Sequence, residues 1–207
     1  AGAGLTSSSI SETLTADATY QTRYDSQYWS GDLRGMKIDS INIATGVIST
    51  TMKWSAAAKL DTLVAGAGWD TARNVVTLKP NDSGTLIGAP FRLASLSAAQ
   101  KTALGSTETE QGNVLNYLRG DTSKESTLSV RKTFRYRASV LGDIVDSAAT
   151  YVGPPSEVYA DAFNPGYSTF KAAKATRKPV VYVGANDGML HAFDARDAGG
   201  DLADVAR

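Results

Sequence analysis

The 207-residue sequence contains a single histidine, His191, and no cysteine. Histidine is the side chain that most often acts as a general base near neutral pH, so a Ser-His-Asp mechanism would have to use this residue. The Gly-x-Ser-x-Gly nucleophile elbow does not occur in the sequence. A zinc site would need carboxylates as its remaining ligands, which is uncommon. We therefore expect His191 to be a hydrogen-bonded packing residue, and we predict no catalytic and no cofactor-binding residue.

Acidic side chains are the next candidates, as metal ligands. The segment 81–84 (Asn-Asp-Ser-Gly) lacks the closing carboxylate of a calcium-binding loop. The segment 194–201 holds three aspartates, but its Ala-Gly-Gly interruption favours a simple turn. Asp32, Asp143 and Asp146 could act as paired carboxylates. Within Gly-Asp-Leu and Gly-Asp-Ile, however, such side chains more often cap backbone amides, so we predict no metal site in this segment.

Arg119-Gly120-Asp121 is the tripeptide that integrins bind in extracellular ligands. Integrin binding requires Arg119 and Asp121 to project from an exposed loop, and we retain Arg119, Gly120 and Asp121 as possible receptor-binding residues. The alternative is structural. The tripeptide follows a predicted helix over 112–118, so Gly120 would be the left-handed residue that ends it. Arg119 would then lie at the carbonyl end of the helix dipole, and we favour this interpretation.

The composition excludes several function classes. Lys+Arg and Asp+Glu number 21 each, so no basic surface of the kind that binds nucleic acid is indicated. No apolar run approaches the length of a membrane span. We therefore expect neither nucleic acid nor a membrane span among the interactions of this chain.

Short strands separated by turns must position these residues. Alternating apolar residues predict strands over 31–41 and 47–54, joined by a turn at 44–46. A further strand is predicted over 74–78, followed by the turn residues of 80–84, and strand character returns within 139–153. Residues 1–19, rich in Ala, Gly, Ser and Thr, are interpreted as a linker or an edge strand.

Short helices are expected between the strands. Ser97 and Gln100 form a capping-box pattern that predicts a helix to Leu104. The stretch 106–111 is interpreted as a solvated loop before the helix over 112–118. A third helix is predicted over 168–174, with Ser168 as its N-cap.

The clearest local signal is a hairpin near the end of the sequence. An apolar run over 180–185 and a second strand over 189–193 flank Asn186-Asp187-Gly188. Asp-Gly supplies the positive φ that a tight hairpin turn requires, so Gly188 is predicted to be left-handed.

This hairpin resembles the blade hairpin of quinoprotein-type β-propellers. Together with Lys178-Pro179 before it, the pattern resembles more narrowly the PilY/PilC family of type IV pilus biogenesis proteins. Four further segments fit that family in the same order: 28–33 (YWSGDL), 53–57 (KWSAA), 116–121 (NYLRGD) and 141–147 (LGDIVDS).

The resemblance implies a fold and an organisation. It implies a mainly β chain that is part of a quinoprotein-like β-propeller with short helical insertions between strands. On this basis 20–207 form the first blades of the propeller, truncated at the C-terminal end, since both ends of the sequence look cut. Trp29, Trp54 and Trp69 are then expected as core anchors. The separate segment is expected to dissolve poorly, because an open propeller exposes strand edges.

The resemblance also implies a function. The family is exported to the cell surface, outer membrane or pilus tip, supports pilus assembly and twitching motility, and mediates adhesion. Expected partners are minor pilins or the tip complex and host or abiotic surfaces, including integrin. Family propellers bind calcium, and we expect such a site only downstream of this segment. The alternative is a fragment of a quinone-dependent propeller dehydrogenase, whose cofactor-binding constellation we do not find here.

Overall fold

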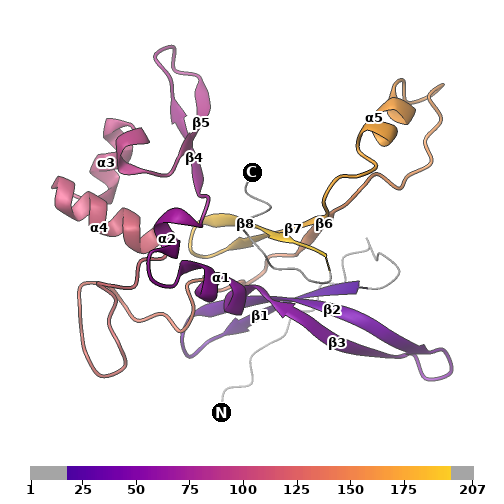
Figure 1. Ribbon diagram of the computed structural model, residues 1–207, viewed down its shortest axis with the longest axis horizontal. Coiled ribbons are helices and arrows are strands. Elements are labelled where there is room, and N and C mark those ends of the chain that lie inside the picture. Colours follow the sequence, from indigo (N-terminus) through magenta and orange to yellow (C-terminus); the bar gives the residue numbers. More distant parts are fainter. Residues whose placement is uncertain (1–17, 197–207) are drawn as a thin grey trace.

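The computed structural model describes residues 18–196, and it is mainly β with short helices, as predicted. Its strands form three small antiparallel sheets, ordered β1-β2-β3, β4-β5 and β6-β7-β8 (Figure 1). The strands are β1 (Ala18–Asp25), β2 (Ser30–Asn42), β3 (Val47–Ser55), β4 (Val76–Pro80), β5 (Leu86–Pro90), β6 (Thr150–Val152), β7 (Val180–Ala185) and β8 (Met189–Asp194). The helices are α1 (Ala56–Val64), α2 (Gly68–Thr71), η1 (Leu93–Ser95), α3 (Ala98–Leu104), α4 (Glu108–Arg119) and α5 (Tyr167–Ala173).

The first sheet confirms the predicted hairpin over 31–41 and 47–54. Alternate residues of β1 and β2 turn one face to the core, because side chains alternate along a strand. Tyr20, Thr22 and Leu33 are buried on that face. Gly35 lies opposite Trp54, and a Cβ there would approach the indole to 2.3 Å. Glycine at position 35 therefore lets the Trp54 ring lie flat against the strand.

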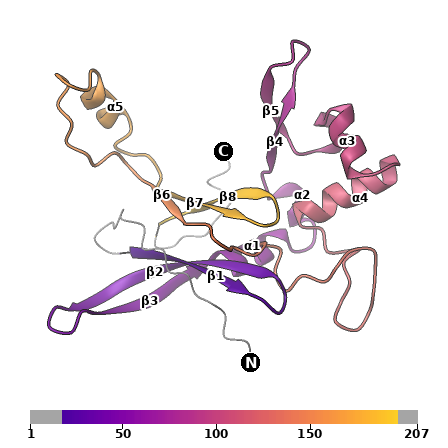
Figure 2. The same ribbon diagram turned by 180° about the vertical axis from the view of Figure 1, so that it is seen from behind.

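The first and third sheets pack over one shared core, which α1 closes at one end (Figure 2). Tyr20 of β1 stacks on Tyr151 of β6 with ring centroids 5.9 Å apart, and its hydroxyl donates to the carbonyl of Ala195 at 3.1 Å. Segments from the two ends of the described chain thus meet. The buried members of this core are Tyr20, Leu33, Trp54, Ala56, Leu60, Val64, Val140, Leu141, Ile144, Ala149, Val181, Val183, Phe193 and Ala195.

We call the segment 68–119, from α2 to α4, the helical insert, and two of its helices begin at capping boxes. Ser97 caps α3 together with Gln100, as predicted. Thr107 and Glu110 form a second capping box that begins α4. The prediction of a loop over 106–111 is therefore wrong from residue 108 onward: the Thr-x-x-Glu pattern initiates a helix even though the stretch is highly polar.

Three segments project from the core: the β4-β5 hairpin, the far end of β2-β3 and the α5 segment (Figure 1). The strand expected over 74–78 lies at Val76–Pro80, and it pairs with β5, which was not predicted. The turn expected at 80–84 is confirmed, with Gly84 at φ 80°. Ser168 is not an N-cap: α5 begins after Gly166, and Ser168 instead donates from its amide and its hydroxyl to Asp161.

Of the predicted strand character within 139–153, only β6 forms a strand. Residues 141–145 run alongside β2 instead, with a single bridge between Ser30 and Gly142. Residues 18 and 19 begin β1, an edge strand of its sheet, whereas 1–17 lie outside the described residues. No helix among residues 18–196 is long and apolar enough to cross a membrane.

Candidate functional site

We call the β7-β8 hairpin the terminal hairpin. Its turn is a hydrogen-bonded junction centred on Asp187. Its Oδ2 accepts from His191 Nε2 at 2.9 Å and from the amide of Gly142 at 3.1 Å, and its Oδ1 accepts from the amide of Met189 at 3.0 Å. Gly188 adopts φ 82°, as predicted. A Cβ on Gly142 would lie 2.7 Å from the Asp187 amide, so this glycine permits the close approach. One carboxylate thus fixes its own turn and a loop 45 residues away.

Asp143 and Asn186 extend this junction. The amide of Asn186 donates to the Asp143 carbonyl at 2.9 Å, and the Asn186 side chain donates to Asp143 Oδ2 at 2.6 Å. Asp143 is buried, but it binds a side-chain amide rather than the backbone amide that we predicted. The junction therefore joins residues 142–143 to the 186–188 turn by main-chain and side-chain bonds together.

Asp32 and Asp146, the other two candidates for paired carboxylates, lie in different surroundings. Asp32 caps backbone as predicted: its Oδ1 accepts from the amide of Ala57 at 3.1 Å, at the start of α1. Its Oδ2 accepts from Arg34 Nε at 2.8 Å. Asp146 is exposed and has a positive φ of 55°. The three carboxylates do not form one site.

The electrostatics of Asp187 fit a structural role. Burial raises the pKa of Asp187, but the hydrogen bonds from His191, Gly142 and Met189 outweigh it and hold that pKa below its ordinary value. His191 is buried, and its ring stacks on Phe193 at 5.9 Å between centroids. The packing role predicted for His191 is therefore what the described residues show. Within residues 18–196, no three His, Asp or Glu side chains are grouped so as to hold a metal ion.

The Arg119-Gly120-Asp121 tripeptide ends α4. Gly120 is its left-handed C-cap, with φ 116°, as the structural interpretation predicts. Arg119 is only 1% exposed. Its Nη1 donates to the carbonyl of Phe91 at 3.2 Å, and its Nη2 donates to those of Trp69 and Asp70 at 3.3 and 3.1 Å. In this conformation the Arg119 guanidinium is not accessible to a receptor.

A second buried arginine, which sequence reasoning missed, completes this cluster. Arg73 Nη1 donates to the carbonyl of Arg119 at 2.9 Å, and its Nη2 lies 3.5 Å from the sulfur of Met189 in β8. Burial lowers the pKa of both Arg73 and Arg119 to about 10, so both remain charged at neutral pH. Arg73 thereby links the helical insert to the terminal hairpin. Its sequence context carries no signal of burial.

The 125–137 loop holds another buried pair that sequence reasoning missed. Arg137 Nη2 lies 2.8 Å from Glu125 Oε2, and the guanidinium covers the Tyr117 ring at 3.8 Å. Glu125 Oε1 also accepts from the Arg137 amide at 2.6 Å. Residues twelve apart in a loop give no periodic pattern, so only the tertiary structure reveals this contact.

The three tryptophans do not share one role. Trp54 is a core residue, as predicted, and Trp69 packs against the core at its margin. Trp29 is 58% exposed and contacts the Tyr24 ring at the β1-β2 turn. The core-anchor prediction is therefore wrong for Trp29, because the turn places it outside both sheets.

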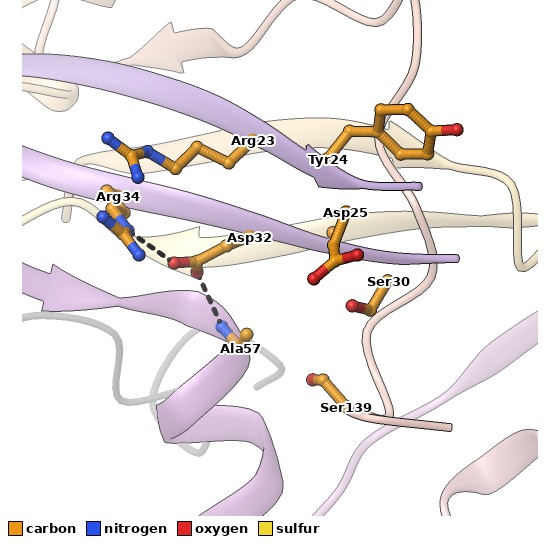
Figure 3. Close-up of a pocket in the computed structure, with 9 residues that line it drawn as sticks. Arg23, Tyr24, Asp25, Ser30, Asp32, Arg34, Ala57 and Ser139 are labelled. Atoms are coloured by element: carbon orange, nitrogen blue, oxygen red, sulfur yellow. Dashed lines mark hydrogen bonds and ion pairs between the residues drawn. The ribbon is translucent and has the colours of Figure 1, made fainter. Parts of the chain in front are cut away.

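A polar pocket of about 290 Å³ lies beside the exposed face of β1 and β2 (Figure 3). Figure 3 shows Arg23 and Arg34 at one end and Asp25 with two serines at the other. Asp32 is held by Arg34 and by Ala57, as described above. Two arginines and two aspartates balance in charge, and no histidine is among the described residues that line it. The pocket could hold a small polar group. Its described lining is Arg23, Tyr24, Asp25, Ser30, Gly31, Asp32, Arg34, Ala57 and Ser139.

The antiparallel sheets make the described chain mainly β, and a match to a family model assigns it to the β-propeller class. A family model described as the PilY1 beta-propeller domain matches residues 141–204, which include the junction and β6-β7-β8. No solved structure gives a significant match.

Sequence relatives cover far more of the chain. A type IV pilus biogenesis factor PilY1 homolog of Xylella fastidiosa is 39% identical over 94% of this chain. The type IV pilus biogenesis factor PilY1 of Pseudomonas aeruginosa strain PAK is 37% identical over 91%, and that of strain PAO1 is 36% identical over 91%. The chain belongs to this PilY1 family, as the resemblance implied. It spans about 14–16% of the length of these relatives.

Proposed function

We propose that this chain is a non-catalytic part of a type IV pilus biogenesis factor that supports pilus assembly, twitching motility and surface adhesion. The observation that carries the proposal is the 36–39% identity to PilY1 proteins over more than nine-tenths of the chain. The relatives' name supplies the biogenesis role. The motility and adhesion roles extend it by family resemblance.

The geometry supports a structural role for the residues that could have done chemistry. His191 and Asp187 are bonded to each other and to the backbone, and no nucleophilic side chain hydrogen-bonds to His191 among the described contacts. The two buried arginines bind main-chain carbonyls. These groups hold loops together, which is the work that a rigid recognition module requires.

The proposal includes location and partners. We infer export to the cell surface, outer membrane or pilus tip, with minor pilins or the tip complex as partners, and host or abiotic surfaces as targets. Integrin stays in the proposal only for a state in which Arg119 becomes exposed. We place any calcium site outside this segment, in the longer protein.

A chimera tests the proposal. In Pseudomonas aeruginosa PilY1, the matching segment would be replaced by this chain and expressed in a strain that lacks the native gene. We expect surface pili and twitching to be restored. A matched chimera carrying Gly35→Trp, which cannot accommodate Trp54, should restore neither. A wild-type chimera that reaches the cell surface at normal levels but restores neither property would overturn the proposal.

A separate experiment tests the proposal that the chain is non-catalytic. The purified full-length protein would be titrated with pyrroloquinoline quinone and calcium and followed by absorbance and calorimetry. We expect no saturable binding of the quinone. Micromolar binding would favour the dehydrogenase alternative instead.

A further inference from the structure

The β4-β5 hairpin presents one wholly apolar face to solvent. Its register pairs Val76 with Pro90, Leu78 with Gly88 and Pro80 with Leu86, which places these six residues on the same face. Val76, Leu78 and Leu86 are 69%, 58% and 62% exposed. A Cβ added to Gly88 would meet no atom within 4 Å, so no other described residue covers the centre of this face. We call it the hairpin face: Val76, Leu78, Pro80, Leu86, Gly88 and Pro90.

The opposite face of the same hairpin belongs to the body of the insert. Ala89 is buried there, while Thr77 and Lys79 are half-buried. Gln100 of α3 donates to the Leu78 carbonyl at 2.9 Å. At the base, the buried Arg119 binds the carbonyl of Phe91. The hairpin is therefore held in place from behind, which gives the hairpin face a fixed orientation (Figure 1).

The β4-β5 hairpin would be only marginally stable if nothing packed on the hairpin face. A two-stranded hairpin is at best marginally stable in water, and contiguous exposed apolar surface marks an interaction site. Further strand pairing is limited, because Pro80 and Pro90, at the ends of the two strands, have no N–H to donate. Packing on the face is therefore favoured over the addition of a strand to an edge.

The absence of charge on the hairpin face indicates the kind of partner. Separate partners that meet by diffusion use charged groups to steer their encounter, and their interfaces carry polar rims. Permanent interfaces instead resemble a domain core cut in half. All six residues of the hairpin face are apolar or glycine, which fits a permanent apolar contact.

We propose that the hairpin face packs against an apolar surface formed by another part of the same polypeptide. This inference rests on the proposed function, under which the chain is part of a protein of PilY1 length. The chain spans only 14–16% of those relatives, so most of such a polypeptide is available as occupant. A tethered segment is present at an effective concentration of about millimolar, which favours it over a second copy or another protein.

Site-specific photo-crosslinking tests the proposal on the purified full-length protein. A benzophenone amino acid would replace Leu78 or, as the matched control, Ile43, which is 94% exposed in the β2-β3 turn. We expect the Leu78 position to crosslink within one polypeptide to peptides outside residues 1–207, at several times the yield of the Ile43 position. Crosslinked dimers, crosslinks to another protein or a yield no higher than at Ile43 would each overturn it.

A stability measurement gives an independent readout. Leu78→Asp should lower the thermal midpoint of the full-length protein, whereas Ile43→Asp should not. Equal midpoints for the two variants would overturn the proposal. Both readouts use purified protein, so they can fail while the chimera still restores pili, and the chimera can fail while they succeed.

Discussion

Two left-handed glycines, Gly120 and Gly188, were both predicted from local sequence patterns: Gly120 ends α4, and Gly188 lies in the turn between β7 and β8. Their φ angles are 116° and 82°. Their surroundings differ. A Cβ on Gly120 would lie 3.0 Å from Val64 and 3.4 Å from Val140, whereas a Cβ on Gly188 would meet nothing within 4 Å. Glycine is needed at position 188 only for its left-handed backbone conformation. Glycine at position 120 also lets the end of α4 pack against the core.

The charged neighbours of these glycines show the same contrast. Asp187, beside Gly188, binds residues of its own hairpin and one loop amide. Arg119, beside Gly120, binds carbonyls of three residues that precede it by 28 to 50 positions. A turn that looks locally defined can therefore be a long-range joint, and substitutions should distinguish the two kinds.

The largest effect is expected at Arg119. Arg119→Met keeps much of the side-chain volume but leaves the carbonyls of Phe91 and Trp69 without their side-chain donor, while the Asp70 carbonyl keeps its bond from Arg92. We expect the free energy of unfolding to fall by about 3 kcal/mol, because buried carbonyls lose their hydrogen-bond donor. Urea unfolding of the purified protein measures this. Arg92→Met is the control, because Arg92 pairs with Asp70 at the surface and should contribute less than about 1 kcal/mol. Equal losses of unfolding free energy in the two variants would contradict the long-range role of Arg119.

Gly120→Ala comes next. The substitution combines strain at positive φ with the contact to Val64, and we expect a loss of about 2–3 kcal/mol. The comparison requires Gly188→Ala to cost less, at about 1 kcal/mol, since only the strain applies there. Thermal or urea unfolding of the two variants side by side checks the order. A larger cost at Gly188 would reverse our interpretation of the two turns.

Gly188→Val tests the turn geometry itself. A β-branched side chain at φ 82° should destabilise by about 1–2 kcal/mol or more, although space for it is open. If Gly188→Val and Gly188→Ala both unfold at the parental urea concentration, the left-handed assignment is wrong.

The junction should also show in the pH dependence of stability. The pKa of Asp187 is lowered in the folded protein, so its contribution is fully present above the ordinary aspartate value of 3.8 and is lost as pH falls through the folded pKa. Asp187→Asn removes this dependence. We expect parent and variant to differ in unfolding free energy at neutral pH and to converge toward acid pH. A difference that grows on acidification would contradict the assignment.

The smallest effect is expected at Asp121. Among the described residues its Oδ1 accepts from the Ser123 amide alone, at 2.8 Å, so Asp121→Glu should change the free energy of unfolding by no more than about 0.5 kcal/mol. Integrin binding by the full propeller is the sharper readout for this variant. If the parent binds and Asp121→Glu does not, the tripeptide is a receptor site and the structural interpretation fails.

Much of the fold was predicted correctly from local sequence patterns. The capping box at Ser97, the hairpin turn at Gly188 and the helix end at Gly120 all depend on contacts within a few residues, so each was predicted correctly. The box at Thr107 has an equally local pattern, and its charged composition was mistaken for that of a loop. Strand β5 was missed because Leu86–Pro90 is short and ends in proline, which weakens the strand signal.

The candidate site likewise has features that the sequence predicted and features that only the tertiary structure showed. The sequence by itself determined that one histidine and no cysteine are available, that Gly188 and Gly120 turn left-handed, and which family the chain resembles. Only the tertiary structure decided that Arg119 is buried while Trp29 is exposed, and that Asp187 binds Gly142. The physical reason is separation: Asp187 and Gly142 are 45 residues apart, and Arg119 and Trp69 are 50. Burial and charge pairing depend on which distant segments pack together, and no local pattern encodes that choice.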